Sequence, residues 1–249
     1  MQYTVIIPAR YNSLRFPGKA LYSISGKPLI LRTLHCSKSR NGTYVATDDK
    51  RIYDAVTKDG GCAVMTSPTH ESGTDRVAEA ARHLKLPPEE IIVNIQGDQP
   101  FIPTNLPKIL ASALKAFPSY SIATPVINKT LTEQELLDNN LVKAALQTDG
   151  QTIGYFYRKV ELEMCPPQIL KRLRKHVGVY AYRNEFIQAF TQMECTPNEC
   201  FFKLEQLRAI DNGYKILAVA IDENIHDVNT PKDIVEVESW LKENGNGQA

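Results

Sequence analysis

The sequence predicts an α/β fold in which helices flank a mixed, mostly parallel sheet, and three observations support this. Short apolar runs alternate with amphipathic stretches through the first hundred residues, and strands separated by helices are typical of parallel sheets. Of the 249 residues, 43% are hydrophobic and 23% are charged, which suits a globular protein. No linker, internal repeat or low-complexity segment divides the chain. We therefore expect residues 1–249 to form a single domain.

In the first half, strands and helices are expected to alternate strictly. Apolar runs predict strands at residues 3–7, 42–46, 62–65 and 90–95, and amphipathic stretches predict helices at 29–38, 50–59 and 72–84. The run at 90–95 is apolar almost throughout, which is typical of a strand that is covered on both faces.

In the second half the pattern is looser. Helices are expected at 105–116 and 231–241, and strands at 121–127, 142–147, 152–158, 176–182 and 215–221. Residues 159–175 contain Pro166-Pro167 and five basic residues, so we expect a surface excursion there rather than core. Residues from about 140 to 190 are expected to form a small β-rich lobe that extends the sheet.

The charge balance and the hydropathy limit the classes of partner. Lysine and arginine total 29 against 28 acidic residues, a net charge of +1, so no global field favours nucleic acid or anionic lipid. No stretch approaches the roughly 18 apolar residues of a membrane span, and residues 1–10 lack a signal-peptide pattern. We expect a cytoplasmic protein with neither a nucleic-acid nor a membrane partner.

The five cysteines are an odd number without a CxxC pair, which argues against a disulfide framework and a zinc site. No histidine lies at ligand spacing beside Cys195 or Cys200. We therefore expect five free thiols.

A basic loop follows the first expected strand. Arg10, Arg15 and Lys19 lie within it, around Pro17-Gly18. Ligands of open α/β sheets bind beyond the carboxyl ends of the strands. Arginine binds phosphate oxygens through two donors and lysine supplies a compact charge, so the loop suits a triphosphate. The alternative is a solvated basic turn, because the loop matches neither a Walker A nor a G-x-G-x-x-G motif.

A second polar cluster follows the apolar run at 90–95. Gln96 and Asp98 flank Gly97, which permits close approach of a ligand to the backbone. Magnesium prefers one or two carboxylates together with waters and substrate phosphates, so Asp98 suits a Mg²⁺ ligand. The alternative is a turn aspartate before Pro100-Phe101.

Six motifs in a fixed order resemble a known family. They are Pro8-Ala9-Arg10, Arg15-Phe16-Pro17-Gly18-Lys19, Ala46-Thr47-Asp48-Asp49, Ser72-Gly73-Thr74-Asp75-Arg76, Gln96-Gly97-Asp98 and Glu205-Gln206-Leu207-Arg208. The series resembles that of the 3-deoxy-manno-octulosonate (Kdo) cytidylyltransferases over residues 1 to about 240. The resemblance implies a glycosyltransferase-A-like (nucleotide-diphospho-sugar transferase) fold and a homodimer. It also implies synthesis of CMP-Kdo and pyrophosphate from CTP and Kdo with Mg²⁺.

The resemblance implies the site residues as well. The catalytic residues would be Arg10, Lys19 and Asp98, and the nucleotide would contact Pro8, Ala9, Arg10, Arg15, Lys19, Ser72, Arg76 and Gln96. The sugar acid would contact Gln96, Arg158, His176, Tyr180, Glu205 and Gln206, and the metal would be held by Asp98, Asp227 and Asn229. Taken alone, His176 is typical of a hydrogen-bonded core histidine, and Glu205 with Arg208 is typical of a surface pair.

The implied reaction fits this set of residues. The anomeric oxygen of the sugar acid attacks the α-phosphorus in line while pyrophosphate leaves, so little covalent chemistry is asked of the protein. Arg10, Arg15, Lys19 and Mg²⁺ would neutralise charge on the triphosphate, and positioning would supply much of the remaining acceleration. No covalent enzyme intermediate is expected.

The chain departs from the family pattern at the metal and sugar sites. The family usually reads Val-Asp-Thr-Pro where residues 228–231 read Val-Asn-Thr-Pro, so an amide, Asn229, replaces a carboxylate and should weaken Mg²⁺ binding. Asp227 would share the face of Asn229 in an extended segment and partly compensate. Tyr157 and Phe202 also depart from the pattern, and Gln99 resembles the branch of the family that uses 8-amino-Kdo.

Three functions stay open at this point. The first is CMP transfer to Kdo for lipopolysaccharide biosynthesis. The second is CMP transfer to 8-amino-Kdo or another acidic sugar. The third is a CTP-binding pseudoenzyme that is weakened by Asn229.

Overall fold

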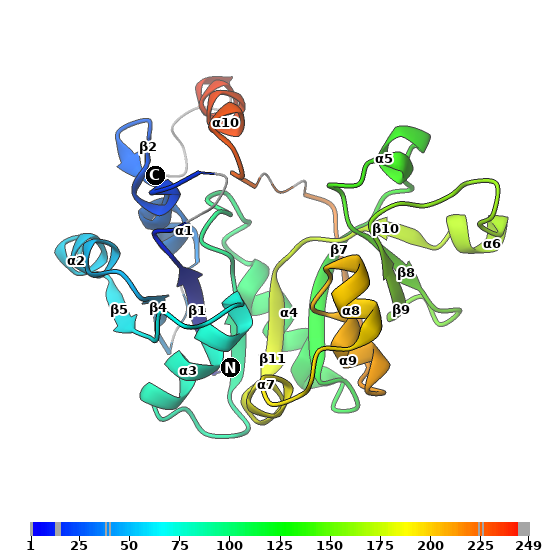
Figure 1. Ribbon diagram of the computed structural model, residues 1–249, viewed down its shortest axis with the longest axis horizontal. Coiled ribbons are helices and arrows are strands. Elements are labelled where there is room, and N and C mark those ends of the chain that lie inside the picture. The colour runs from blue at the N-terminus through cyan, green and yellow to red at the C-terminus, as the bar shows by residue number, and fades with distance from the viewer. Residues whose placement is uncertain are drawn as a thin grey trace.

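A continuous sheet runs through the molecule and carries most of its core (Figure 1). The computed structural model describes residues 2–12, 16–37, 39, 41–223, 225 and 227–243. Within these residues the sheet has ten strands in the order β10-β8-β9-β12-β7-β11-β6-β1-β4-β5. Their bounds are Thr4–Ala9 (β1), Thr43–Thr47 (β4), Cys62–Met65 (β5), Ile91–Asn94 (β6), Ile122–Ile127 (β7), Lys143–Leu146 (β8), Thr152–Tyr157 (β9), Leu173–Lys175 (β10), Tyr180–Arg183 (β11) and Ile216–Ile221 (β12).

The strand pairings make the sheet mixed, with most strands pointing in one direction. β1, β4, β5 and β6 form parallel pairs, and so do β7 and β12. β11 pairs antiparallel with both β6 and β7 and so joins the two parallel parts. β9 and β10 also run against the majority, next to β8 at the far end of the sheet. The predicted α/β fold with a mostly parallel sheet is confirmed.

Helices cover both faces of this sheet. One layer holds α1 (Leu29–Cys36), α2 (Lys50–Lys58) and α4 (Leu106–Ala116), and the other holds α3 (Gly73–His83), α7 (Asn184–Phe190) and α9 (Leu207–Asp211). Val5 and Ile7 of β1 belong to the first core cluster, whereas Ile6 between them belongs to the second. A strand that is buried on both faces needs apolar residues at successive positions, which explains its unbroken apolar sequence.

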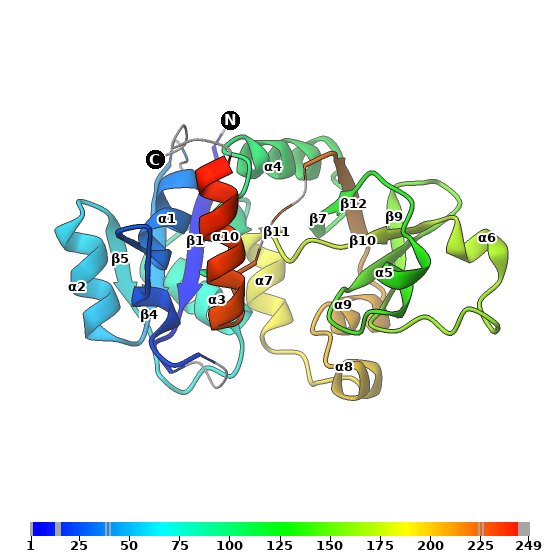
Figure 2. The same ribbon diagram turned by 90° about the horizontal axis from the view of Figure 1, so that it is seen from above.

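Short elements complete the fold. They are α5 (Glu133–Leu137), α6 (Pro167–Leu170), α8 (Pro197–Phe202), the 3₁₀ helix η1 (Lys19–Leu21), the hairpin of β2 (Ser23–Ile24) and β3 (Lys27–Pro28), and the last helix α10 (Pro231–Glu243). The strands β8, β9 and β10 lie with α5 and α6 at the opposite end of the molecule from α2 and β5 (Figure 2). α10 returns to the N-terminal half, where Ile234 and Val237 are buried in one cluster with Phe16 and Ile24.

Two sequence-based predictions lie outside the parallel strands, and the second was wrong. Residues 159–175 lie mostly at the surface as expected, but Val160 and Leu173 are buried in one cluster with Leu136. The apolar side chains between the basic ones therefore anchor this segment. Cys195 and Cys200 are joined in a disulfide and are not free thiols. The start of α8 at Pro197 brings the two cysteines together, with their Cα atoms 6.4 Å apart.

In the described part of the chain, every helix is too short or too polar to cross a membrane.

Candidate active site

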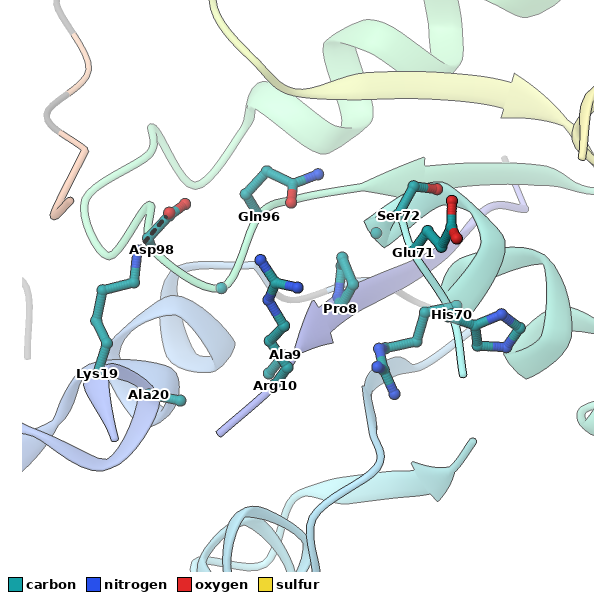
Figure 3. A pocket seen from close by; sticks show the side chains of 13 residues that line it. Pro8, Ala9, Arg10, Lys19, Ala20, His70, Glu71, Ser72, Gln96 and Asp98 are labelled. Carbon is teal, nitrogen blue, oxygen red and sulfur yellow. Dashed lines mark hydrogen bonds and ion pairs between the residues drawn. The ribbon is translucent and has the colours of Figure 1, made fainter. Parts of the chain in front are cut away.

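A cavity of about 470 Å³ opens at the carboxyl ends of β1 and β6 and at the start of α3 (Figure 3). Three short segments supply most of its lining: residues 8–10 at the carboxyl end of β1, residues 70–73 before and at the start of α3, and residues 96–98 after β6. Lys19 and Ala20 of η1 and Arg76 of α3 complete it. The neighbouring carboxyl ends of parallel strands meet at one edge of the sheet, which explains why these separate motifs converge. We call this cavity the nucleotide pocket.

Lys19 connects η1 to two other segments by hydrogen bonds, the loop after β6 and the segment before α10. Its Nζ atom donates to Oδ2 of Asp98 at 2.7 Å and to the carbonyl oxygen of Val228 at 2.9 Å. The backbone N–H of Val228 in turn donates to the carbonyl of Asp98 at 2.9 Å. Gly18, with a left-handed φ of 74°, leads into η1 and places Lys19. The C-terminal segment before α10 is thereby held beside the loop that follows β6.

Ser72 and Arg76 have structural duties within the wall of this pocket. The Ser72 hydroxyl accepts from the backbone N–H of Asp75 at 3.0 Å, and the Asp75 carboxylate accepts from Ser72, which caps α3. Arg76 is 3% exposed and donates to Asp48 at 2.9 Å and to Thr66 at 2.7 Å. The motif Ala46-Thr47-Asp48-Asp49 thus acts by holding Arg76 in place.

A second cavity, of about 860 Å³, continues from the first. Arg10, Gly73 and Gln96 line both cavities, and the side chains of Arg10 and Gln96 project into the space between the Lys19–Asp98 pair and Ser72 (Figure 3). We call the second cavity the acceptor groove. Its other lining residues come from segments that are far apart in sequence: Thr74, Asp138, Asn140, Leu141, Val142, Arg158, Lys175, His176, Gly178, Tyr180, Lys203, Leu204, Glu205, Gln206, Ile225 and Asp227.

The structure brings the predicted sugar-site residues together in this groove. Gln96, Arg158, His176, Tyr180, Glu205 and Gln206 all line it. Two donors of the Arg158 guanidinium are already used, because its Nε and Nη2 atoms donate to the carbonyls of Phe202 and Lys203, both at 2.9 Å. Gln96 donates to Asn94 at 3.1 Å, which fixes the amide where the two cavities meet.

His176 lies in the floor of the groove as a neutral side chain. Burial lowers its pKa to about 3. Its Nε2 atom lies 2.9 Å from the Thr124 hydroxyl, and its ring contacts Phe156 and Tyr180, with ring centroids 5.0 and 5.4 Å away. Because Thr124 also donates to a backbone carbonyl, His176 is the donor to Thr124. It is both a buried, hydrogen-bonded histidine and a lining residue.

Glu205 lines the groove and has one buried carboxylate oxygen without a hydrogen-bond partner among the described residues. Its Oε2 atom accepts from the Thr74 hydroxyl at 2.8 Å, whereas Oε1 is buried without a hydrogen-bond partner among the described residues. Burial raises the pKa of this carboxyl, and hydrogen bonds from Thr74 and Ser72 oppose the rise. The predicted surface pair with Arg208 does not form. Arg208 instead donates to both carboxylate oxygens of Glu199, at 2.6 and 2.7 Å, because α8 packs against α9.

Two carboxylates face each other where the groove approaches Lys19. Asp98 lines the nucleotide pocket and Asp227 lines the groove. Asp227 is exposed to the groove, yet the surrounding protein and the negative charge of Asp98 raise its pKa to about 6, while a hydrogen bond from Gln99 lowers it. Asn229 is partly exposed and is not among the lining residues of either cavity. In the described chain, no three His, Cys, Asp or Glu side chains are grouped for a metal ion.

Some predicted residues lie elsewhere and some lining residues were not predicted. Arg15 lies outside the described residues. His70 and Glu71 line the nucleotide pocket, and their position directly before Ser72 was a signal that could have found them. Lys175 and Lys203 line the groove, but no spacing in the sequence links two lysines that are 28 positions apart.

Comparisons with known proteins agree with this geometry. A sequence profile described as cytidylyltransferase matches residues 4–216. The chain belongs to this cytidylyltransferase family. The 3-deoxy-manno-octulosonate cytidylyltransferase of Syntrophus aciditrophicus is 40% identical over 243 residues, which cover 95% of this chain and 96% of the relative. The 8-amino-3,8-dideoxy-manno-octulosonate cytidylyltransferase of Shewanella sp. strain ANA-3 is 38% identical over 249 residues, covering 97% and 99%.

A solved structure resembles this cytidylyltransferase closely. It is CMP:2-keto-3-deoxy-manno-octonic acid synthetase complexed with CTP, with a TM-score of 0.88 and 32% identity, and the match covers 98% of this chain and all of the other. The cytidylyltransferase therefore has the nucleotide-diphospho-sugar transferase fold that its motifs predicted.

Proposed function

We propose that this cytidylyltransferase couples CTP with Kdo to give CMP-Kdo and pyrophosphate, for lipopolysaccharide biosynthesis. The observation that carries the proposal is the continuity of two cavities that share Arg10, Gly73 and Gln96. A transferase that joins two substrates directly needs both bound side by side. Arg10 and Lys19 are the cations of the nucleotide pocket that suit the triphosphate. Arg76 is almost fully buried in its pair with Asp48, whereas the Lys19–Asp98 pair is more exposed.

The charges of the acceptor groove suit a sugar acid. Arg10, Arg158, Lys175 and Lys203 supply positive charge for a carboxylate. Glu205 offers its unpartnered oxygen to a sugar hydroxyl, and such a buried acceptor gains most from a substrate donor. A neutral His176 leaves recognition of the carboxylate to the arginines and lysines.

We propose Mg²⁺ as the cofactor, held by Asp98 and Asp227. The donor set fits, because Mg²⁺ takes one or two carboxylates and completes its shell with water and substrate phosphates. The Lys19 ammonium bound to Asp98 and the effect of Asp98 on the pKa of Asp227 both indicate a place that favours positive charge. When bound, Mg²⁺ would neutralise charge on the triphosphate. Asn229 stays a predicted third ligand.

The reaction then needs no covalent enzyme intermediate. The anomeric oxygen of the sugar acid forms a bond to the α-phosphorus as the bond to the β-phosphate oxygen breaks, and the hydroxyl proton leaves to solvent. Arg10, between the two cavities, stabilises charge near the reacting phosphate, and Lys19 stabilises the leaving pyrophosphate.

A pyrophosphate-release assay tests the proposal. CTP and Mg²⁺ are supplied with Kdo, 8-amino-Kdo or a nonulosonate, and turnover with Kdo well above the others is expected. Competition by ATP and GTP should be weak, because the pocket would be sized for a pyrimidine. CTP binding without turnover of any sugar acid would indicate the pseudoenzyme instead.

8-Amino-Kdo is the second candidate acceptor. Gln99 is 1% exposed and its amide bonds Asp227, whereas many family members have glutamate at this position. The groove also holds Asp138, Glu205 and Asp227, which could pair with an ammonium group. A higher kcat/KM for 8-amino-Kdo than for Kdo in the same assay would decide for it.

We propose further that the cytidylyltransferase is a cytoplasmic homodimer that pairs through residues 140–190. Met164, which is 79% exposed, supports an apolar contact in this region. Light scattering across a dilution series tests the dimer, and a monomer at every concentration would count against it.

A further inference from the structure

Lys143 is fully buried, which is unusual for a lysine. It is 0% exposed and is among the largest fully buried side chains of the described residues. It lies on β8, opposite Tyr157 of β9 and Lys175 of β10. Lysine is almost never fully buried unless its ammonium is paired. Its place in the interior therefore needs a specific partner.

The partners of Lys143 are two carbonyls in the walls of the acceptor groove. Its Nζ atom donates to the carbonyl oxygen of Asp138 at 2.5 Å and to that of Arg158 at 2.6 Å. Asp138 and Arg158 both line the groove, although they are 20 positions apart. Burial lowers the pKa of Lys143, and the negative charge of Asp138 opposes this.

The side chain of Arg158 connects this part of the groove to a third segment, residues 202–206. It donates to the carbonyls of Phe202 and Lys203, which precede the groove residues Leu204, Glu205 and Gln206. One buried ammonium and one guanidinium thus link the turn at 138–142, the end of β9 and the segment at 202–206. An aliphatic side chain would fill the space around Lys143 but would remove the link between the two carbonyls. The Asp138 carbonyl would keep the backbone N–H of Leu141 as a donor, whereas the Arg158 carbonyl would lose the ammonium and the spacing of the two walls would no longer be fixed.

We propose that Lys143 is a positioning residue for the acceptor: it fixes the walls of the groove and so sets the affinity for the sugar acid, without contacting it. This rests on the proposed function, in which the groove binds the acceptor. The nucleotide pocket shares no wall with Lys143, so binding of CTP should be independent of it.

The test compares Lys143→Met with a control of similar structural cost. Leu110→Ala creates a cavity at a fully buried residue of α4 that lines neither cavity of the site. Lys143→Met should raise KM for the acceptor about tenfold, as for a lost buried hydrogen bond, and leave KM and Kd for CTP within about twofold. Lys143→Arg keeps the charge and should raise KM for the acceptor less. Leu110→Ala should lower Tm but should not raise KM for the acceptor more than KM for CTP.

A second measurement does not depend on turnover. Hydrogen exchange should become faster at 138–142 and 202–206 in Lys143→Met and stay unchanged at 90–98. Equal changes of both KM values, or unchanged exchange at 202–206, would overturn the positioning role. If the parent enzyme turns over no sugar acid, the proposed function fails, and the exchange data still decide whether Lys143 orders these walls.

Discussion

The nucleotide pocket and the acceptor groove adjoin each other but are built differently. The pocket takes its lining mainly from three short segments at or after the carboxyl ends of β1, β5 and β6. The groove takes its lining from residues spread between 10 and 227, on elements of both ends of the sheet. The carboxyl ends of parallel strands lie at one edge of a sheet because of the strand arrangement alone. The walls of the groove need long-range hydrogen bonds, such as those of Lys143 and Arg158, to meet.

Under the proposed function, this difference would separate recognition of CTP in the pocket from recognition of the sugar acid in the groove. A pocket made by the topology of the sheet tolerates little change, because two of its three segments are anchored by the buried strands β1 and β6. A groove held by polar links can change its shape through single substitutions in its walls. Departures from the family pattern at Tyr157, Phe202 and Gln99 lie at or beside the groove, where Tyr155 contacts both Tyr157 and Phe202.

The largest effect is expected from a substitution in the nucleotide pocket. Asp98→Asn removes the charge that pairs with Lys19 and the principal proposed metal ligand, so kcat/KM should fall by about 10³-fold. The fold should survive, because Asp98 is partly exposed and its backbone bond to Val228 remains. Pyrophosphate release and thermal melting are measured together, with Asp54→Asn on the exposed face of α2 as control. A folded variant that is fully active at limiting Mg²⁺ would exclude Asp98 from the metal site.

The second prediction tests whether His176, in the floor of the groove, is buried as a neutral side chain. The pKa of His176 falls from 6.5 to about 3 on folding, so between these values the unfolded chain binds a proton that the folded chain does not. The contribution of His176 to the free energy of unfolding is therefore complete above pH 6.5 and decreases as the pH falls toward 3. At pH 5 the loss is on the order of 2 kcal/mol. His176→Gln keeps a donor for Thr124 and should lose this acid sensitivity. Urea unfolding at pH 7 and pH 5 measures it.

The control for His176 is Thr57→Ala on the exposed face of α2, which changes no titrating group and should leave the difference in unfolding free energy between the two pH values unchanged. If His176→Gln and the parent lose the same stability between pH 7 and pH 5, His176 is not held neutral. The groove would then contain a charge that binds the acceptor directly.

A third effect should separate the two substrates. Glu205→Gln replaces the unpartnered acceptor oxygen of the groove, so KM for the acceptor should rise about 20-fold, close to 2 kcal/mol for a bond to a charged group. KM for CTP should stay constant. Steady-state kinetics in both substrates measure the split, with the exposed Glu185→Gln on α7 as control. Equal increases of both KM values would show that the two cavities are not separate sites.

The sequence predicts the pocket well because its information is local. β5 has the bounds that its apolar run predicted, and α3 begins after Ser72, whose capping box with Asp75 is a short-range signal. All described residues that were predicted for the nucleotide line the pocket. By contrast, α5, α7, α8 and α9 have only five to seven residues each, too few for a clear helical period.

The remaining errors concern partners that only the fold supplies. Arg208 pairs with Glu199 on α8 and not with Glu205, and the Cys195–Cys200 disulfide depends on where α8 begins. Lys143, for which the sequence analysis made no prediction, also depends on such partners, because a lysine in a β-type segment is typical of an exposed edge. Its burial follows from β9 and β10 pairing on either side of β8.

The smallest expected effect lies at Asn229, in the segment that Lys19 holds through the carbonyl of Val228. With Asp98 and Asp227 as the carboxylates of the proposed metal site, the phosphates of CTP must supply much of the metal's coordination, so the Mg²⁺ requirement should be high. Asn229→Asp restores a negative charge at almost constant volume and should lower the Mg²⁺ concentration for half-maximal activity about tenfold, or roughly 1.4 kcal/mol. Asp227→Asn should raise it if Asp227 has taken over the ligand role. Magnesium titrations of turnover for the parent and both variants give the answer.

The structure makes this last test sharper than the sequence alone. The backbone N–H groups of Asn229 and Thr230 donate to Asp233 at 2.7 and 2.8 Å, and Lys19 bonds the carbonyl of Val228, so the segment is fixed before any metal binds. Asn229→Asp therefore tests charge and not a rearrangement of the chain, and Mn²⁺ binding followed by electron paramagnetic resonance checks it without turnover. Three superimposable titration curves would mean that the segment does not contact the metal. The groove would then meet the pocket at Arg10, Gly73 and Gln96, and Asp98 would be the one carboxylate left in the proposed metal site.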